Sequence, residues 1–452
     1  MDSFTIDQLL VFDKYVAGQN VFASGAGGVG KSFLIKHIFK HAKDNNKNIK
    51  VTALTGCAAI LLQSDALTLH AFAGFGLALD TIDIIIAQLF DKPFKLKHWK
   101  ALHILIVDEV SMMSLKIFKI IDAIGRKYFK KPDLPFGGLQ VIFTGDFFQL
   151  LPVNNDLNDR EASMFCFQDP LWDAVFPKQN QIILNTIFRQ QDEGFLKVLK
   201  YVRQGRITHS TKALLESRVF SPEALQEIQK TKVLTVLSPI RKDVEKINRL
   251  AYDALGDECE KQVYTVKYVQ LSKKSDMPLQ GIEDSLLNLQ LNSNPYLKHE
   301  YDFLANNIHV DKILQLRIGC HVMCIANILT SGLANGSQGI VVAFTGSGLP
   351  MVKFNTIEQP VLVDYHTWRS EANKSVAVMQ IPLIYAWAVT IHKSQGTTLE
   401  NAIMDIGSNI FADGQTYVAL SRVKSIEGLY LTKFDYTKIT ANPIVKAFYE
   451  RF

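Results

Sequence analysis

Cysteine is scarce in this chain of 452 residues, and the five cysteines are scattered along it. An odd, irregularly spaced set does not form a disulfide framework, so we expect free thiols and a reducing compartment. Cys320 and Cys324 lie close enough in sequence to suggest a metal pair. The residues around them are typical of a strand, however, and four strand residues separate two α-carbons by roughly 13 Å. We therefore expect both thiols in the protein core.

Long apolar runs, repeats and low-complexity segments are also missing. No apolar stretch approaches the roughly 18 residues that a membrane span needs, and the first residues lack the layout of a secretory signal. We expect an intracellular protein, in the nucleus, the cytoplasm or a viral replication site, and not a secreted one. Apolar residues make up 48% of the chain, which supports a packed core. The net charge of +5 permits an anionic partner without requiring one.

Short β-rich runs alternate with helical patterns in the first part of the chain. The runs lie at 21–23, 50–54, 103–107 and 141–143. Continuous apolar runs between helices indicate a parallel sheet that is buried on both faces. We predict an α/β domain at 1–180, interrupted by a smaller insert at 65–99.

A second α/β series follows, with strands expected at 234–237, 401–406 and 428–431. We assign it to residues 181–257 and 384–452. Between these parts, glycine-punctuated short strands predict a β-rich insertion at 258–383, similar to a small barrel. The expected fold class is therefore α/β, with two parallel sheets and two inserts.

A glycine-rich string at 25–32 matches the spacing of a phosphate-binding loop. Its residues are Gly25, Ala26, Gly27, Gly28, Val29, Gly30, Lys31 and Ser32. The string stands between a predicted strand and a predicted helix. The glycines let backbone N–H groups face phosphate oxygens, Lys31 reaches the terminal phosphates, and the Ser32 hydroxyl can bind Mg²⁺. A glycine-rich turn without a ligand is the less favoured interpretation.

Two carboxylates, Asp108 and Glu109, follow the buried run at 103–107. Asp108 can hold Mg²⁺, and Glu109 can orient or deprotonate an attacking water. An Asp-Glu pair that merely begins a helix would be the better interpretation without a phosphate loop nearby.

Three more polar residues are candidates for sensing the terminal phosphate. Gln149 follows the run at 141–143 and offers both a donor and an acceptor, although alone it is only a polar loop residue. Arg189 and Arg422 lie outside the first predicted domain. Arginines supplied by a second domain can stabilise charge during phosphoryl transfer, whereas a surface ion pair is the simpler interpretation.

The motifs, taken in order, resemble the PIF-type (petite integration frequency) DNA helicases of superfamily one, relatives of the RecD and Dda helicases. The matching segments are GAGGVGKS at 25–32, TGCAA at 55–59, TLHAFAG at 68–74, DEVSM at 108–112, PFGGLQ at 135–140, GDFFQLLPV at 145–153, FRQ at 188–190, AWAVTIHKSQGTTL at 386–399 and YVALSR at 417–422. The resemblance implies two RecA-like domains, a wedge at 65–99 and an SH3-like β-barrel at 258–383.

For the nucleotide, the resemblance implies that Lys31 and Ser32 bind ATP with Mg²⁺. It implies that Asp108 and Ser32 hold the metal and that Glu109 activates a water. It makes Gln149, Arg189 and Arg422 sensors of the terminal phosphate and places Gly396 near the nucleotide. Gln8 would read adenine, because an amide can pair with the N6 and N7 edge of that base. Without the resemblance, Gln8 is a surface residue on an early helix.

For DNA, the resemblance implies contacts to a single strand from six residues, Thr55, His70, Phe72, Thr390, His392 and Lys393. Hydroxyl, imidazole and ammonium groups suit phosphates, and an aromatic ring can stack on a base. Core packing is the competing interpretation for Phe72.

The activity that the resemblance implies is that of an ATP-dependent DNA helicase. It would move 5′-to-3′ on single-stranded DNA as a monomer and unwind tailed duplexes in replication, recombination, repair or telomere maintenance. A RecD- or Dda-like helicase of the same superfamily would share this chemistry. A phosphate-loop kinase would share residues 25–32, but its turnover would be indifferent to DNA. A DNA-binding module with an inactive nucleotide site would bind DNA without hydrolysis.

Overall fold

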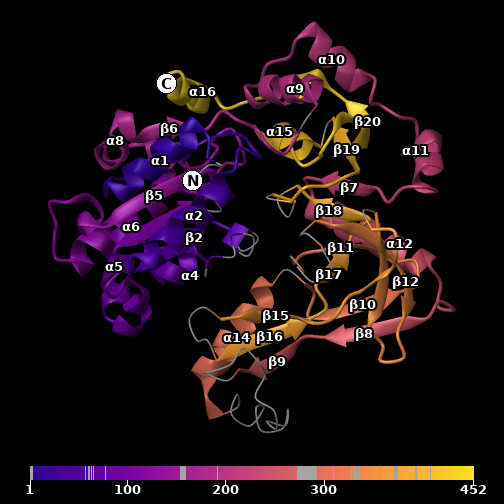
Figure 1. Cartoon of the computed structure of the whole chain (residues 1–452), viewed down its shortest axis with the longest axis horizontal. Coiled ribbons are helices and arrows are strands. Elements are labelled where there is room, and N and C mark those ends of the chain that lie inside the picture. Colours follow the sequence, from indigo (N-terminus) through magenta and orange to yellow (C-terminus); the bar gives the residue numbers. More distant parts are fainter. Residues whose placement is uncertain are drawn as a thin grey trace. The chain divides into compact units, whose positions relative to one another are not determined.

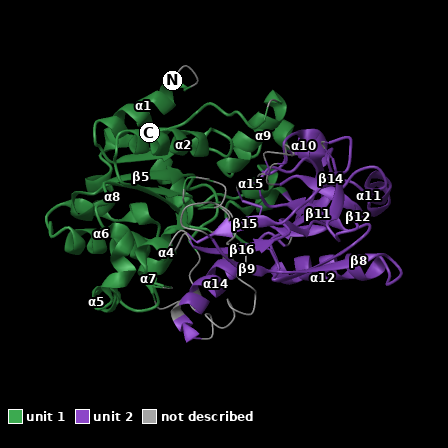
Figure 2. Cartoon of the chain, turned by 60° about the horizontal axis from the view of Figure 1, so that its bottom comes forward, with its two compact units in different colours: residues 1–211, 411–421, 436–452 green, residues 212–410, 422–435 purple. Residues whose placement is uncertain are grey.

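Two units divide the chain, and each combines segments that are distant in sequence. In the computed structural model, unit 1 comprises residues 1–211, 411–421 and 436–452, and unit 2 comprises residues 212–410 and 422–435 (Figure 2). The structure describes residues 4–452 apart from 56–57, 60–61, 63, 65, 77, 153–158, 191, 272–292, 309, 327, 329–332, 334–335, 356, 371–374, 392–393, 396 and 408.

The sheet of unit 1 is parallel and has six strands in the order β3-β2-β4-β5-β1-β6. Its strands are β1 (Val21–Ser24), β2 (Ile49–Ala53), β3 (Leu67–Thr68), β4 (Ile104–Asp108), β5 (Gln140–Gly145) and β6 (Gln181–Ile183). Four of them coincide with the runs that the sequence predicts. The parallel α/β class is confirmed.

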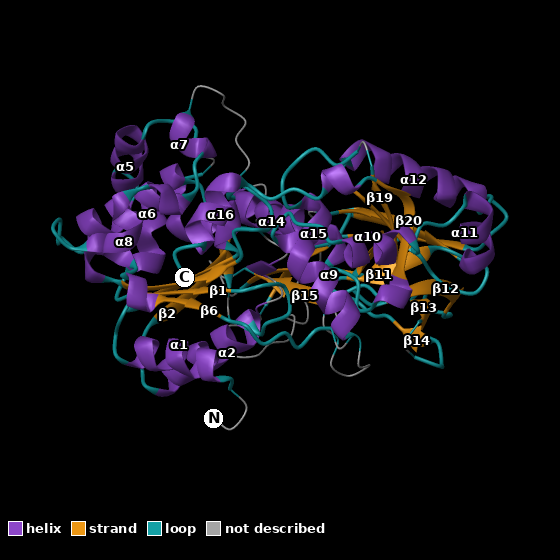
Figure 3. Cartoon of the chain, turned by 90° about the horizontal axis from the view of Figure 1, so that it is seen from above, coloured by secondary structure: helices purple, strands orange, loops and turns teal. Residues whose placement is uncertain are grey.

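Both faces of this sheet are buried, and alternate residues of a strand enter opposite cores. In β1, Phe22 joins one apolar cluster while Val21 and Ala23 join the other. Side chains along a strand point alternately to the two faces, so an unbroken apolar run needs helices on both. Figure 3 shows helices α1 (Ile6–Val16) and α2 (Lys31–Asp44) on one side, and α6 (Leu115–Tyr128) and α8 (Pro170–Val175) on the other.

Strand pairing extends the first sheet beyond the predicted boundary at residue 180. Strand β6 pairs with β1 in register Phe22 with Gln181, although the sequence suggests that the second α/β series starts there. Three residues of extended chain are enough to pair with the open edge of β1. The remaining predicted domain boundaries stay predictions.

The C-terminal segment also packs within unit 1. Helix α16 (Pro443–Tyr449) places Phe448 against Phe167, with ring centroids 4.2 Å apart, and Tyr449 stacks on Phe148 at 4.7 Å. Helix α15 (Gln415–Leu420) belongs to the same unit. Aromatic contacts thus join α16 to unit 1, and α15 belongs to the same unit, whereas the sequence assigns 384–452 to the second domain.

The insert at 65–99 contributes to the core of unit 1. It contains α4 (Leu69–Ala73), α5 (Ile82–Phe90) and the 3₁₀ helix η1 (Pro93–Trp99). Trp99 and Phe72 are fully buried, with ring centroids 5.1 Å apart. The insert therefore packs on the sheet that carries the phosphate loop.

Unit 2 contains a second parallel sheet in the order β18-β7-β19-β20. Its strands are β7 (Thr235–Ser238), β18 (Ala388–Thr390), β19 (Ala402–Ile406) and β20 (Leu429–Phe434). The side chain of Asn248, on helix α12 (Arg241–Ala254), exchanges hydrogen bonds with both backbone groups of Ala388 at 2.8 and 2.9 Å. The second α/β series of the sequence is confirmed as a parallel sheet.

Antiparallel sheets lie between the parts of this second series. One has five strands in the order β14-β13-β12-β11-β17, and smaller sheets join β15-β16-β9 and β10-β8. The strands are β8 (Lys261–Thr265), β9 (Lys267–Gln270), β10 (Ile313–Arg317), β11 (His321–Cys324), β12 (Gln338–Phe344), β13 (Pro350–Phe354), β14 (Val361–Leu362), β15 (His366–Arg369), β16 (Val376–Gln380) and β17 (Leu383–Tyr385). Cys320 and Cys324 are fully buried, as expected for core residues.

Further helices lie in the described part of the chain, which Figure 1 traces from indigo to yellow. The remaining α-helices are α7 (Arg160–Ser163), α9 (Glu193–Arg203), α10 (His209–Glu216), α11 (Pro222–Gln229) and α14 (Pro295–Asn307), and the 3₁₀ helices are η2 (Val110–Met112), η3 (Pro135–Gly138), η4 (Cys166–Gln168), η5 (Lys178–Asn180), η7 (Ile426–Gly428) and η8 (Tyr436–Lys438). Within the described ranges, no helix has both the length and the apolar character needed to cross a membrane.

Candidate functional site

Several candidate residues of unit 1 lie at the carboxyl ends of three neighbouring strands. Strand β1 ends at Ser24, β4 at Asp108 and β5 at Gly145, and β5 pairs with both of the others. The backbone N–H of Gly25 donates to the Gly145 carbonyl at 3.1 Å. Ligands of open α/β sheets bind at this edge. The phosphate loop and the two carboxylates therefore share one site.

The phosphate loop has the conformation that its glycines permit. Gly28 and Gly30 have φ of +88° and +83°, in the left-handed region that side chains disfavour. A Cβ on Gly28 would lie 2.5 Å from the Cβ of Arg189. Helix α2 starts at Lys31, directly after Gly30, so its N-terminal N–H groups and positive dipole end adjoin the loop.

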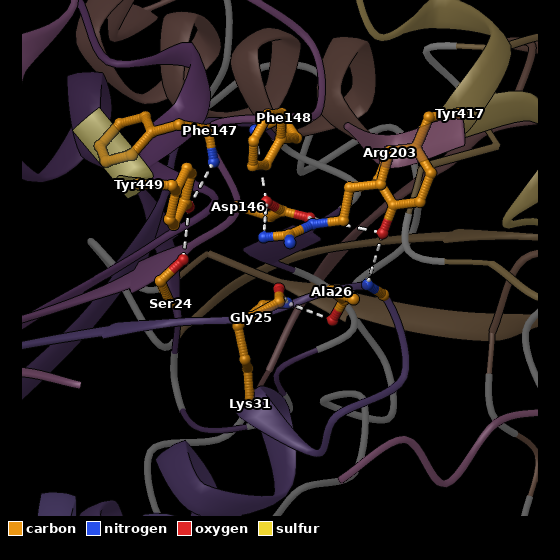
Figure 4. Close-up of polar contacts among 11 residues, drawn as sticks. Ser24, Gly25, Ala26, Lys31, Asp146, Phe147, Phe148, Arg203, Tyr417 and Tyr449 are labelled. Carbon is orange, nitrogen blue, oxygen red and sulfur yellow. Dashed lines mark hydrogen bonds and ion pairs between the residues drawn. The ribbon is translucent and has the colours of Figure 1, made fainter. Parts of the chain in front are cut away.

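Lys31 is nearly buried, and its ammonium group is bonded to its own loop. Nζ donates to the carbonyls of Gly25 and Ala26 at 2.7 and 3.0 Å (Figure 4). Burial lowers the pKa of Lys31, and the nearby carboxylates of Glu109, Asp146 and Asp108 oppose that shift. The charge of Lys31 is thus compensated by three nearby carboxylates, while the charge of Arg189 opposes it.

Asp108 is buried and held by two hydrogen bonds. Its Oδ1 accepts from the backbone N–H of Glu109 at 2.9 Å and from the Thr144 hydroxyl at 2.5 Å. Burial raises the pKa of Asp108, whereas the Thr144 hydrogen bond and the charge of Lys31 lower it. Glu109 itself has φ +55° and ψ +43°, a left-handed conformation that is unusual outside glycine and is found at functional sites.

The residues at this edge fit a magnesium ion. Both hydrogen bonds of Asp108 reach Oδ1, so neither of these donors occupies Oδ2. Ser32 is exposed on the first turn of α2 and offers a hydroxyl oxygen. Mg²⁺ is held by oxygen ligands, commonly one or two from the protein together with phosphates and waters.

Arg189 lies beside the same loop, and Gln149 lies in the segment that follows β5. The Phe188 N–H donates to the Gly28 carbonyl at 2.8 Å, which fixes the segment that carries Arg189. Arg189 Nη1 donates to the Ser421 carbonyl at 3.4 Å. Gln149 is buried, and its backbone N–H donates to the Asp146 carbonyl at 2.8 Å. Arg422 belongs to unit 2 and is buried, and its role stays a prediction.

Gln8 is buried, so its interpretation as a surface residue is wrong. Its Nε2 donates to the Val29 carbonyl at 3.2 Å, and its Oε1 accepts from the Thr5 N–H at 3.1 Å. The second contact is half of a capping box that starts α1. Gln8 therefore links α1 to the phosphate loop, while its proposed reading of adenine stays a prediction.

The predicted DNA residues have different environments. The Thr55 hydroxyl accepts from the Ala58 N–H at 3.2 Å, and His70 is half-buried in α4, where burial lowers its pKa. Phe72 is fully buried, which favours core packing in this conformation. Thr390 is buried at the end of β18. His392, Lys393 and Gly396 lie outside the described residues.

Sequence reasoning misses an ion pair beside the phosphate loop. Arg203, at the end of α9, donates to both carboxylate oxygens of Asp146, and the Tyr417 hydroxyl bonds to the same carboxylate (Figure 4). Asp146 and Tyr417 fall inside the matched motifs at 145–153 and 417–422, so the motifs are a signal that could have identified these two residues. Arg203 lies in no matched segment and follows an ordinary amphipathic helix pattern.

Comparisons with known proteins agree with the order of these motifs. A family model described as PIF1-like helicase matches residues 4–213, and one described as the 2B domain of DNA helicase Pif1 matches residues 302–344. The ATP-dependent DNA helicase PIF1 of Danio rerio is 34% identical over 98% of this chain and 63% of its own length. The chain thus spans less than two thirds of that curated relative.

Solved structures extend the similarity to three dimensions. The Pif1 helicase from Candida albicans is 29% identical with a TM-score of 0.71, and the alignment covers 100% of this chain and 99% of that chain. A Pif1 helicase from Bacteroides in complex with ADP-AlF3 and ssDNA is 27% identical with a TM-score of 0.59, covering 99% and 96%. Together with the two parallel sheets and the phosphate loop, these matches show that the chain belongs to the PIF1-like helicase family.

Proposed function

We propose that this protein is an ATP-dependent DNA helicase, and that it moves 5′-to-3′ along single-stranded DNA. The observation that supports this proposal most directly is the strand-end cluster of Lys31, Asp108 and Glu109 around a phosphate loop. A helicase needs a nucleotide site with a charge-neutralising cation and a water-activating carboxylate. The relative from Bacteroides binds ADP-AlF3 and ssDNA, which makes the same ligands the first candidates here.

The roles of the residues follow from their chemistry. Lys31 would exchange the carbonyls of Gly25 and Ala26 for phosphate oxygens, which compensate its charge better. Ser32 and Asp108 would hold Mg²⁺, which neutralises charge on the phosphates when it is bound. Glu109 would orient the attacking water and accept its proton. Its left-handed backbone is fixed by the hydrogen bond from its N–H to Asp108.

The remaining site residues would link hydrolysis to movement. Gln149, Arg189 and Arg422 would sense the terminal phosphate, and Gln8 and Gly396 would lie near the base and the nucleotide. Thr55, His70, Thr390, His392 and Lys393 would contact the DNA backbone. The 65–99 insert would act as a wedge and the β-rich region at 258–383 as a clamp. Domains at 1–180, 181–257 with 384–452, and 258–383 would be the working parts of a monomer.

Replication, recombination, repair and telomere maintenance are the processes that suit this activity. Each provides single-stranded DNA next to a duplex. We expect affinity for single strands to fall steeply as salt rises, because phosphate contacts release counterions.

Strand separation from tailed duplexes tests both the activity and its direction. One substrate carries a 5′ single-stranded tail and the other a 3′ tail of equal length. We expect ATP-dependent unwinding of the 5′-tailed duplex alone, and none with Lys31→Ala. Unwinding of only the 3′-tailed duplex would overturn the direction, and unwinding of neither, with ATP turnover unaffected by DNA, would favour a phosphate-loop kinase.

A further inference from the structure

One backbone donor of the phosphate loop is occupied by a side chain of unit 1. The N–H of Gly27 donates to the hydroxyl of Tyr417 at 3.1 Å (Figure 4). Tyr417 lies on α15, 390 residues further along the chain, and only 2% of it is exposed. Backbone N–H groups of such loops are the donors that cradle phosphate. The tyrosine oxygen therefore stands where a phosphate oxygen would accept this bond.

The direction of the hydrogen bonds is fixed by the chemistry of the partners. An ionised carboxylate only accepts, so the Tyr417 hydroxyl donates its proton to Asp146 Oδ2, at 3.4 Å. Its lone pairs then face the Gly27 N–H. A hydroxyl oriented in this way satisfies the amide but presents no proton to an incoming phosphate oxygen.

Asp146 is itself held in place. Arg203 donates from Nε to Oδ2 at 2.9 Å and from Nη2 to Oδ1 at 2.7 Å, and Asp146 is fully buried. The guanidinium carbon lies 4.6 Å from the ring centroid of Phe148 and 5.2 Å from that of Tyr449. A bidentate, ring-covered arginine keeps the carboxylate oriented.

Close packing also fixes the helix that carries the tyrosine. Gly414 precedes α15 with φ +78°, and a Cβ there would lie 2.6 Å from the Phe148 carbonyl and 2.8 Å from that of Gln149. The start of α15 thus lies directly on the loop that follows β5. The backbone at the start of α15 is therefore held against this loop.

The hydrogen bonds of the Lys31 ammonium group are likewise made within the protein, since it donates to two loop carbonyls. We propose that Tyr417 is an internal competitor of the nucleotide, whose hydroxyl occupies the Gly27 N–H and must leave it when a phosphate group binds. The Asp146–Arg203 pair sets the strength of this competition by holding the hydroxyl. This inference rests on the proposed function, because it concerns the same nucleotide site.

The competition has a consequence for product release. When the phosphate leaves, the Tyr417 hydroxyl returns to Gly27 and compensates the amide that would otherwise lose its partner. Gly27 is half-buried, and pairing its N–H again favours nucleotide dissociation.

Removal of the hydroxyl tests the proposal. The 452-residue chain, as wild type and as Tyr417→Phe, is titrated with a fluorescent ADP analogue in the presence of Mg²⁺. We expect Tyr417→Phe to bind about 2- to 10-fold more tightly, because one neutral hydrogen bond no longer competes with the phosphate. Equal or weaker affinity of Tyr417→Phe would overturn the proposal.

Tyr449→Phe is the matched control. The Tyr449 hydroxyl bonds to Ser24 Oγ and accepts from the Phe147 N–H, so it lies beside the same arginine without touching Gly27. We expect its removal to lower the melting temperature without tightening nucleotide binding. Equal tightening in both variants would indicate general loosening of the site and would also overturn the proposal.

Two further arms keep the test decisive. If Tyr417→Phe does not fold, Tyr417→Leu takes its place, because it also removes the hydroxyl from Gly27 and should likewise tighten binding. Failure of wild type to bind the analogue at all would contradict the proposed nucleotide site itself. That result is distinct from wild-type binding with no gain in the variants, which contradicts only the role of Tyr417.

Discussion

Arg203 and Asp146 form a buried, two-pronged ion pair within unit 1. The two hydrogen bonds measure 2.9 and 2.7 Å, and the Asp146 side chain has no exposed surface. Burial lowers the pKa of the guanidinium, but the adjacent carboxylate outweighs it, so the net shift of the Arg203 pKa is upward. The pair joins the end of α9 to the loop after β5.

Arg203→Met should lower the free energy of unfolding by about 3 to 5 kcal/mol, because it leaves a buried carboxylate without its cation. Urea unfolding measures the change. Arg203→Met combined with Asp146→Leu should recover part of the loss. Lys230→Met is the control, since the Lys230–Glu227 pair is 68% and 72% exposed and should contribute about 1 kcal/mol or less. Equal losses of unfolding free energy in Arg203→Met and Lys230→Met would contradict a larger contribution of the buried pair.

Phe72 offers a direct choice between packing and DNA stacking. The side chain is fully buried against Trp99, so Phe72→Ala should cost about 3 to 5 kcal/mol of stability. Phe72→Leu keeps most of the apolar volume and should retain the affinity for single-stranded DNA. Fluorescence anisotropy with an oligo-dT strand gives the readout. A large loss of affinity in a Phe72→Leu protein of normal stability would instead show that the ring stacks on a base.

His98 should make the stability of the protein depend on pH. Burial, together with the charges of Lys50 and Lys97, lowers its pKa from 6.5 to about 4. Between these values the unfolded chain binds more protons than the folded one, so stability is complete above pH 6.5 and falls as the pH drops toward 4. Melting temperatures of His98→Gln should fall less between about pH 6.5 and 5 than those of wild type. A fall of the same size in His98→Gln and wild type would contradict this role of His98.

Gly125 should resist a substitution that normally stabilises helices. It lies inside α6, where alanine is ordinarily favoured by about 1 kcal/mol. A Cβ at this position would lie 2.5 Å from the Phe136 carbonyl, in the turn of η3. Gly125→Ala should therefore lose about 1 to 3 kcal/mol in urea unfolding. Gly346→Ala, with no atom within 4 Å of the added Cβ, should change stability little, and a stabilised Gly125→Ala would refute the close contact.

Much of unit 1 can be predicted from local pattern. The runs that become β1, β2, β4 and β5 are continuous and apolar because both faces of the sheet are covered. The glycines at 28 and 30 mark the loop since other residues rarely adopt its backbone angles. Asp108 and Glu109 follow their strand directly, so their position at the sheet edge follows from strand direction alone.

Contacts between distant segments could not be predicted in this way. Nothing in the sequence near Arg203 shows that Asp146 will be its partner, since the pairing depends on how α9 packs. Strand β6 has only three residues, too few for a clear pattern, and its place in the first sheet depends on the open edge of β1. The contact of Tyr417 with Gly27 arises because the chain returns to unit 1 after a long excursion.

ATP turnover in the presence and absence of a short oligo-dT strand is the most direct test of the helicase proposal. Wild type should hydrolyse ATP slowly alone and many times faster with DNA, while Lys31→Ala should show neither rate. Turnover by wild type that is indifferent to DNA, or hydrolysis that survives in Lys31→Ala, would contradict it.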